Sequence, residues 1–374
     1  MSAEAPEPEE FARRRRLMQL LRERDADVYV SDRPADIRYL TGSEEAAGVV
    51  LAFADGTTEL VVAAIGLAAA TATTAATLVS APGVGDALDP LVADRVLANG
   101  AERVILAVGG TSQVTLGTAI AAIARLELDA RLGEELRRQK SPGERALLRR
   151  AASQCDAGLA AAFAALRPGV SELEVAAAVE AAIRVAGAEG TAFATNLASG
   201  GRGSFPNARA SDKLLALGEL GFLDLGPLCG GYHADAARTF VLGSPTRTQT
   251  AIVEAVLSAL AWALRALEPG ILGHEVYRGV AASLAASGFE GPMPHHAGHG
   301  LGLFGAERPW MLPGSQDDVR IGDHLALEVG VYVPYVGGAR IEQDIIVTAS
   351  GYELLTMFPL DPVVSPTSSV SLHA

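Results

Sequence analysis

The chain has 374 residues, of which 49% are apolar and 20% are charged. This composition excludes wholesale disorder, and the length is sufficient for two average domains with a large buried core. The formal net charge is −14, which argues against a nucleic-acid partner because a phosphate backbone needs a clustered positive surface. The basic run Arg13 to Arg16 is better explained as the solvated face of a helix. Two cysteines are too few for a disulfide framework, which favours a reducing cytoplasm.

An uncharged stretch over residues 60–85 is long enough to cross a bilayer. It consists mainly of Ala, Thr and Gly, which gain little in lipid, and it divides into two predicted strands around an alanine-rich segment. The N-terminus is acidic and rich in proline, so we expect no signal peptide. The expectation is a soluble cytoplasmic protein with no membrane partner.

The first part of the chain alternates helices and strands. Residues 1–10 are expected to be a flexible tail. Periodicity then predicts helices over residues 11–24, 36–40 and 86–99, and strands over residues 27–30, 48–53, 58–65, 77–80 and 103–108. This alternation predicts a compact α/β domain over residues 11–137.

A second domain, predicted over residues 138–360, begins with a strong helix signal. Ser141, Pro142 and Glu144 combine a cap, a first-turn proline and an acid three residues after the cap. The sequence predicts helices over residues 142–166, 171–187, 249–267 and 274–287, and strands over residues 218–226, 231–242, 322–333 and 338–348. Strands arranged in hairpins make this domain mixed α+β. Residues 361–374 are expected to form a C-terminal tail.

The first predicted hairpin carries two aspartates. Asp224 and Asp235 are symmetric about Cys229 and Gly230. In that register they face each other across a tight hairpin with Cβ atoms about 5 Å apart. Like charges so placed repel, and one acid must take up a proton unless a cation lies between them.

The second predicted hairpin repeats this arrangement with Glu328 and Glu342, which are symmetric about Tyr335. Taken alone, the four acids could equally be solvated acids at strand ends. His299, however, lies between two glycines, where the backbone can approach closely and an imidazole can reach a metal. Four carboxylates and one histidine suit hard divalent ions such as Mn, Fe or Co. Two ions sharing carboxylates would generate a hydroxide near neutral pH.

These motifs resemble those of the pita-bread metallopeptidases, which comprise aminopeptidase P, prolidase, methionine aminopeptidase and the metal-free creatinases. The resemblance covers about residues 138–357, and its ligand spacing is similar to the prolidase pattern. It rests on Asp-Leu-Gly at 224–226, Gly-Tyr-x-x-Asp-x-x-Arg-Thr-Phe at 231–240, Gly-His-Gly-Leu-Gly at 298–302, Glu328, and Arg-Ile-Glu at 340–342. Segments at 15–21 and 36–42 look like the creatinase-type N-terminal domain. The resemblance implies a pita-bread catalytic domain behind a smaller α/β domain.

The resemblance also implies an activity. It is that of a dinuclear metal-dependent hydrolase of the Xaa-Pro aminopeptidase or prolidase type, which uses a metal-bridging hydroxide on an amide bond. Manganese is the expected metal, with iron, cobalt and zinc as alternatives. The implied partners are a small peptide or small-molecule substrate and a second copy of the chain in a homodimer.

By this resemblance five residues bind metal: Asp224, Asp235, His299, Glu328 and Glu342. Asp224 and His299 hold different ions, Asp235 and Glu342 bridge them, and Glu328 binds the ion of His299. Glu328 is also a candidate catalytic residue that shuttles a proton. His295, four residues before His299, is expected to contact substrate, and its alternative reading is a loop histidine satisfied by the backbone. The other histidines are read as structural or surface residues: His233, His274, His296, His324 and His373.

Two positions depart from the family pattern. Asn207 and Ala306 stand where the peptidases usually carry histidines that orient or protonate the scissile peptide. An asparagine cannot titrate, and an alanine side chain can neither donate nor accept a hydrogen bond. The sequence therefore predicts an altered substrate pocket, formed by Asn207, Phe304, Ala306, Arg308, Trp310, Tyr332 and Arg340.

Two alternative functions remain beside the peptidase interpretation. The altered positions are also consistent with a pita-bread hydrolase or lyase that acts on a non-peptide metabolite. A non-catalytic binding module is disfavoured, because five intact ligands are costly to keep charged without metal.

Overall fold

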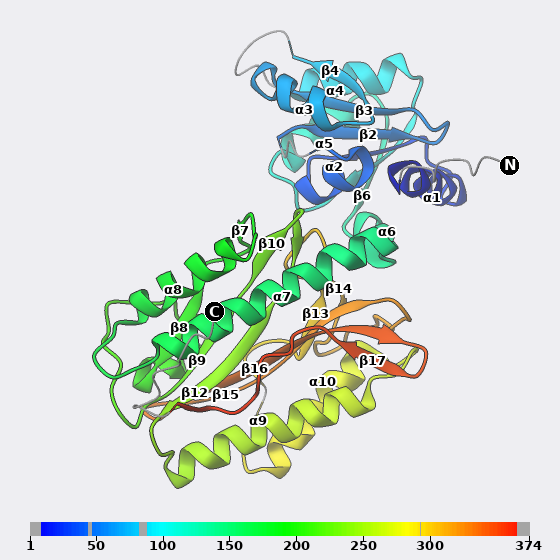
Figure 1. The fold of residues 1–374 in the computed structure, drawn as a ribbon. Helices are drawn as coiled ribbons and strands as arrows, with labels where there is room; N and C mark the ends of the chain where they lie inside the picture. Colours follow the sequence, from blue (N-terminus) through cyan, green and yellow to red (C-terminus); the bar gives the residue numbers. More distant parts are fainter. Residues whose placement is uncertain (1–8, 44–46, 82–87, 292, 365–374) are drawn as a thin grey trace, which may run out of the picture. The chain divides into compact units, whose positions relative to one another are not determined.

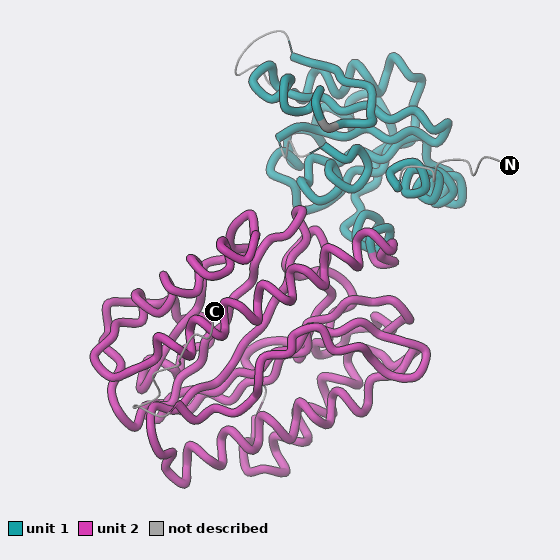
Figure 2. The backbone as a smooth tube through the Cα atoms, viewed as in Figure 1, with its two compact units in different colours: residues 1–137 teal, residues 138–374 magenta. Residues whose placement is uncertain are grey.

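The computed structural model describes residues 9–43, 47–81, 88–291 and 293–364. The chain divides into two compact units, residues 1–137 and residues 138–374 (Figure 2). Each unit has its own apolar core. Among the residues that the structure describes, no helix combines the length and the apolar character needed to span a bilayer.

The first unit is built on a six-stranded sheet in the order β4-β3-β2-β1-β5-β6. The central strands β1, β2 and β3 pair antiparallel, whereas β4, β5 and β6 are added in parallel. The elements are α1 (Glu9–Glu23), β1 (Val28–Ser31), α2 (Pro34–Thr41), β2 (Val49–Phe53), β3 (Thr58–Val62), α3 (Leu67–Thr73), β4 (Thr77–Ser80), α4 (Leu88–Ala98), β5 (Arg103–Ala107), α5 (Gln113–Ala121), β6 (Arg125–Asp129) and α6 (Leu132–Arg138). The alternation of helices and strands predicted for this region is confirmed.

Two boundaries of this unit differ from the sequence predictions, and a third falls outside the described residues. The helix α1 begins at Glu9, inside the expected tail, while residues 1–8 lie outside the described residues. The strand expected to reach residue 65 ends at Val62, because the chain turns into a short 3₁₀ helix at Ala64–Gly66. The expected start of the helix near residue 86 lies outside the described residues, and α4 is described from Leu88.

The four long helices of the second unit begin within about two residues of where the sequence predicts them, and three of them carry side-chain caps. Ser141, Ser171 and Thr246 each accept a hydrogen bond from the third residue of the helix that follows, in complete capping boxes. These caps start α7 (Pro142–Ala165), α8 (Glu172–Val185) and α9 (Arg247–Ala266), and α10 (Gly273–Ala286) follows.

The strands of the second unit form two main sheets and one small sheet. Their orders are β18-β12-β9-β8, β14-β13-β15-β16-β17 and β11-β10-β7. Helices α7 and α8 pack on the four-stranded sheet, and α9 and α10 pack on the five-stranded sheet (Figure 1). The strands are β7 (Gly190–Thr191), β8 (Asn196–Ser199), β9 (Leu220–Leu225), β10 (Pro227–Cys229), β11 (Tyr232–His233), β12 (Ala236–Leu242), β13 (Gly298–Gly300), β14 (Glu307–Trp310), β15 (His324–Val333), β16 (Gly337–Thr348), β17 (Gly351–Leu354) and β18 (Val363–Val364).

The C-terminal end differs from its expectation. Residues 363–364 form β18, which pairs in parallel with β12, so the segment expected to be a tail from residue 361 begins with ordered structure. Residues 365–374 lie outside the described residues.

Two side chains of β12, in the four-stranded sheet, form hydrogen bonds with the backbone of β16 in the five-stranded sheet. Arg238, which is 1% exposed, donates from Nη1 to the carbonyl of Glu342 at 2.7 Å. The hydroxyl of Thr239 donates to the carbonyl of Arg340 at 3.0 Å. These buried hydrogen bonds hold β12 against β16, and thereby fix the acid-bearing strands relative to one another.

Candidate metal centre and active site

The second acid-bearing hairpin has the register that its symmetry predicts. Glu328 on β15 and Glu342 on β16 are direct cross-strand partners, and the ladder continues without interruption to Val333 and Gly337. Tyr335 lies at the turn with a φ of 65°. Direct partners on one face have Cβ atoms about 5 Å apart, so both carboxylates point to the same place.

The register expected for the first hairpin is wrong by two positions. Asp224 on β9 lies opposite Ala237, not opposite Asp235. The turn is centred on Gly230 and Gly231, which have φ values of 59° and 74°. Two consecutive left-handed residues make the tight turn that suits a twisted hairpin, and glycine adopts that conformation at the least cost. Asp235 therefore lies two residues before the position opposite Asp224.

His299 is brought to these acids by β13, where it lies opposite Ala326 of β15. The glycines on either side are needed for the close approach of the strands. A Cβ atom at Gly298 would lie 2.5 Å from the carbonyl oxygen of Ala326, and one at Gly300 would lie 2.2 Å from that of Arg308. Both distances are too short for any other residue, so the glycines allow β13 to enter the sheet.

The five expected ligands converge in one buried cluster. Each is at most 9% exposed. The Nε2 atom of His299 lies 3.8 Å from Oδ2 of Asp235 and 3.8 Å from Oε1 of Glu342. Three carboxylate oxygens are buried with no hydrogen-bond partner among the described residues: Asp224 Oδ1, Asp235 Oδ1 and Glu342 Oε1.

The electrostatics of the cluster fit a bound cation. Burial raises the pKa of Asp235 and of Glu342 well above the ordinary range, and neighbouring carboxylates raise it further. Burial also raises the pKa of Asp224, although Arg340 opposes this shift. Burial lowers the pKa of His299 to about 4, which keeps the imidazole neutral at pH 7. A neutral imidazole beside acids that need a counter-charge is the protonation state that divalent metals require.

Glu328 differs electrostatically from the other acids. Burial raises its pKa, but nearby cationic and imidazole groups outweigh burial and hold the pKa below its usual range. The imidazoles of His295 and His296 approach its carboxylate to 3.4 and 2.8 Å, and Nε of Arg340 approaches it to 3.5 Å. Glu328 is therefore ionised at neutral pH.

Arg340 connects the acids to the expected substrate residues. Its Nη1 lies 2.5 Å from Asp224 Oδ2, its Nε donates to the Tyr332 hydroxyl at 2.8 Å, and its Nη2 donates to the Pro206 carbonyl at 3.0 Å. His295 lies next in this network, with Nε2 at 3.0 Å from the Tyr332 hydroxyl. Its Nδ1 lies 2.7 Å from the His296 carbonyl. One ring nitrogen is thus satisfied by the backbone and the other faces a side chain of the site.

The remaining expected substrate residues lie at different depths. The Trp310 ring lies 5.9 Å from the His299 ring and therefore belongs to the cluster. Arg308 forms an ion pair with Asp317. Phe304 is 52% exposed, Asn207 is also exposed, and Ala306 is half-buried.

A cavity of about 380 Å³ adjoins the network at Tyr332 and Pro206. Its lining includes five apolar side chains: Leu284, Phe289, Met293, Val331 and Val333. The sequence gives no direct signal for this cavity, because its lining comes from three separate segments.

Two features of the site were missed by sequence reasoning. His296 lies against Glu328 and His299, although it was grouped with the structural histidines. Its position directly after His295 is the only sequence signal. The second feature is a buried ion pair between Lys140 and Glu307 at 3.1 Å, with side chains 1% and 0% exposed.

The other histidines have varied surroundings. His233 and His274 each place Nδ1 within hydrogen-bond distance of a backbone carbonyl, at 3.2 and 2.9 Å. His324 is buried, and burial lowers its pKa well below the ordinary value. His373 lies outside the described residues.

Comparisons with known proteins agree with this geometry. The family model "Metallopeptidase family M24" matches residues 146–349, and "Creatinase/Prolidase N-terminal domain" matches residues 13–130. The uncharacterized peptidase YqhT of Bacillus subtilis is 33% identical over 282 residues, which are 75% of this chain and 80% of that protein. An Xaa-Pro dipeptidase of Pyrococcus horikoshii is 37% identical over 222 residues, which are 59% of this chain and 63% of that protein. The match thus spans less than two thirds of the Pyrococcus protein.

Solved structures confirm the expected fold. The Xaa-Pro dipeptidase from Bacillus anthracis superposes with a TM-score of 0.87 at 27% identity, covering 95% of this chain and 99% of that one. The prolidase from Pyrococcus horikoshii OT3 superposes with a TM-score of 0.86 at 27% identity, covering 94% and 99%. The second unit therefore has the pita-bread fold of the prolidases. The chain belongs to metallopeptidase family M24 and carries a creatinase/prolidase N-terminal domain.

Proposed function

We propose that the chain is a dinuclear metal-dependent hydrolase that cleaves the amide bond of small peptides of the Xaa-Pro type. Membership of a metallopeptidase family implies divalent metal ions, and relatives named Xaa-Pro dipeptidases support the substrate class. The observation that carries the proposal is the set of three buried carboxylate oxygens without a hydrogen-bond partner among the described residues. Such oxygens are suitable ligands for hard divalent cations.

In this proposal five residues hold two ions: Asp224, Asp235, His299, Glu328 and Glu342. Asp235 and Glu342 are the proposed shared ligands, and an oxygen of each lies 3.8 Å from His299 Nε2, a spacing that lets both acids reach the ion of that histidine. When bound, the ions would lower the pKa of water and polarise a peptide carbonyl. We expect manganese, with iron, cobalt or zinc as alternatives.

Glu328 is the proposed proton carrier of the site. It is ionised because its pKa is held low, so its carboxylate can accept a proton from an attacking water molecule. Its burial at 6% exposure keeps bulk solvent away from that proton. The same carboxyl group can then return the proton to the leaving amine.

The proposed substrate-orienting group is His295 with Tyr332. Burial lowers the pKa of His295 and raises the pKa of Tyr332, so both are neutral at pH 7. A neutral His295 whose Nδ1 donates to the His296 carbonyl has Nε2 as an acceptor for the Tyr332 hydroxyl. The ring is thus held in one tautomer and one orientation beside the cavity that Tyr332 lines. That cavity can receive an apolar part of a small peptide.

The altered pocket is expected to slow peptide cleavage. Two donors that meet developing charge in related peptidases are replaced by Asn207 and Ala306. Loss of one such donor costs about 100- to 1000-fold in turnover. The intact metal ligands would still supply a nucleophile, so activity on Xaa-Pro peptides should be measurable and weak.

Kinetics of the manganese-loaded protein on Xaa-Pro dipeptides and tripeptides test this proposal. The Asn207→His, Ala306→His double variant should raise kcat/KM by about 100-fold or more, since it restores two imidazoles that can both donate a hydrogen bond and transfer a proton. An Asn207→Gln, Ala306→Asn variant is the matched control, because it places an amide donor of similar size at each position without restoring a titratable group. Wild-type turnover that equals ordinary prolidases, with no gain in the double variant, would refute the altered pocket.

A second candidate function follows from the same two positions. An enzyme without the peptide-handling histidines is also suited to a small non-peptide metabolite, in a hydrolase or lyase reaction. A panel of small amides and charged metabolites, with product analysis, separates the two functions. A non-peptide compound cleaved faster than every Xaa-Pro peptide would favour the second function.

A further inference from the structure

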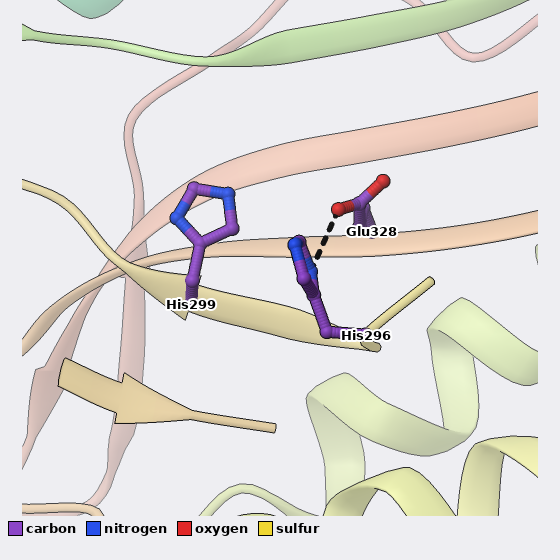
Figure 3. A group of neighbouring side chains, drawn as sticks. All are labelled: His296, His299 and Glu328. Atoms are coloured by element: carbon purple, nitrogen blue, oxygen red, sulfur yellow. Dashed lines mark ion pairs between the residues drawn. The ribbon is translucent and has the colours of Figure 1, made fainter. Parts of the chain in front are cut away.

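His296 lies where a metal ligand would lie. Its Nδ1 atom is 2.8 Å from Oε1 of Glu328, and its ring lies 5.0 Å from the ring of His299. One potential ligand atom from each of these three side chains falls within 4.8 Å of the others. Figure 3 shows the two imidazoles side by side, with His296 directed at the Glu328 carboxylate.

The orientation of the His296 ring favours a ligand over a simple hydrogen-bond donor. Nδ1 is buried and, among the described residues, has no partner with the alignment of a hydrogen bond, although Glu328 Oε1 is 2.8 Å away. Two atoms bound to one ion at about 2.1 Å in an octahedral arrangement lie about 3 Å apart. The spacing of Nδ1 and Oε1 is therefore that of two neighbouring ligands.

His295 does not share this property, although it is adjacent in sequence. Both of its ring nitrogens have partners, the His296 carbonyl at 2.7 Å and the Tyr332 hydroxyl at 3.0 Å. His296 instead packs its ring 5.4 Å from the ring of Trp310, which also lies 5.9 Å from His299. The indole packs beside both imidazoles, and the Nδ1 edge of His296 faces Glu328.

We propose that His296 is a sixth protein ligand of the metal centre and binds, through Nδ1, the same ion as His299 and Glu328. This inference rests on the proposed metal centre. It changes the donor set of that ion from one imidazole to two. Imidazole donors favour Co²⁺ and Zn²⁺ over Mn²⁺ more strongly than carboxylates do. A site with two histidines should therefore bind Co²⁺ or Zn²⁺ more tightly than a site with one.

Proton NMR of the cobalt-loaded protein counts the bound imidazoles directly. Each imidazole bound to paramagnetic Co²⁺ gives one strongly shifted N–H resonance that disappears in D₂O. We expect two such resonances in the wild-type protein and one in His296→Asn. The matched control His274→Asn should keep both, because His274 is engaged with the Ser315 carbonyl at 2.9 Å.

Metal affinity supplies a second readout. Loss of a residue that only supports a metal ligand typically lowers metal affinity by about 10- to 100-fold. The His296→Asn substitution should lower the affinity for Co²⁺ by more than this. If His296→Asn gives no shifted resonance, His299→Asn decides the matter, since it should keep the resonance of His296. A single wild-type resonance that persists in His296→Asn would overturn the inference and leave the metal centre intact. Failure to bind cobalt at all would instead contradict the proposed function.

Discussion

The two hairpins that supply the acids position them by different means. Glu328 and Glu342 face each other within one uninterrupted ladder between β15 and β16. Asp224 belongs to β9, but Asp235 lies between β11 and β12 and takes part in neither strand. Its backbone N–H donates to Oδ2 of the buried Asp344 at 3.1 Å. Strand pairing sets the backbone positions of both glutamates, whereas the backbone position of the second aspartate depends on another side chain.

The turns of the hairpins explain part of this difference. The first hairpin uses Gly230 and Gly231, both with positive φ, and its strands pass from one sheet to another at Gly226 and Ala234. The second hairpin uses Tyr335 as its one described non-glycine residue with positive φ, and its strands stay in one sheet. A hairpin that changes sheets needs additional contacts to hold its functional residues.

The largest expected effect comes from removing one shared ligand on each hairpin. Asp235→Asn and Glu342→Gln should each lower kcat by about 1000-fold or more, the upper range for loss of one electrostatic group. The two variants should be equally inactive if both residues are shared between ions. Steady-state kinetics with saturating manganese check this, and a difference of more than about tenfold between them would break the equivalence of the two hairpins.

Replacement of Asp344 should affect the first hairpin alone. Asp344→Leu removes the acceptor of the Asp235 N–H and should weaken metal binding by about 10- to 100-fold. Burial raises the pKa of Asp344 well above its ordinary value, so replacement of this carboxyl by an amide is a mild change. Asp344→Asn, which is similar in shape and keeps a carbonyl oxygen that can accept the Asp235 N–H, should bind metal almost normally. Competition with a coloured chelator measures both, and equal losses would contradict a positioning role.

Stability should depend on pH through the raised acids. The folded pKa of Glu342 lies above its unfolded value, so its contribution is present at low pH and is lost as the pH rises through the folded pKa. The buried histidines act in the opposite direction near pH 6, because their folded pKa values are lowered. The histidines are present in both the wild type and Glu342→Gln. The difference in stability between these two metal-free proteins therefore isolates the contribution of Glu342.

The wild type should lose stability relative to Glu342→Gln as the pH rises from about 5 to 8. Asp235→Asn should show the same relative change, since burial and neighbouring carboxylates raise the pKa of Asp235 as well. Thermal unfolding with and without manganese provides the measurement. Parallel curves for wild type and variants would show that these acids do not titrate in the expected window.

The smallest expected effects distinguish the two turns. Tyr335 is 97% exposed with a φ of 65°, so Tyr335→Gly should stabilise the protein by about 0.5–1 kcal/mol by relieving the left-handed strain. Gly230→Ala should destabilise it by about 1–2 kcal/mol, since φ is 59° and the added Cβ would lie 2.9 Å from Leu147 Cδ2. Urea unfolding midpoints give both values, and shifts of the same sign would contradict the turn assignments.

The elements that the sequence predicts well are those with local signals. Capping residues locate α7 and α8 to within a few residues, because Ser141 and Ser171 act on their own helices. The strands β7, β8, β13 and β14 have only two to four residues each. Their pairing is set by distant segments, so local sequence carries little information about them.

The site shows the same division. Counting from Tyr335 locates the glutamate pair, because the ladder on either side is regular. The aspartate register was missed because Gly230 and Gly231, rather than Cys229 and Gly230, form the turn. The consecutive glycines were the available signal. His296 could not be separated from His295 by sequence, because the choice depends on how the chain enters β13.

Metal stoichiometry is the most direct test that the two hairpins form one centre for two ions. Elemental analysis of manganese-reconstituted protein should find up to two ions per chain in the wild type. Asp235→Asn and Glu342→Gln should each lose both ions, whereas Asp224→Asn should keep the ion held by His299. Full occupancy in either Asp235→Asn or Glu342→Gln would contradict a shared centre.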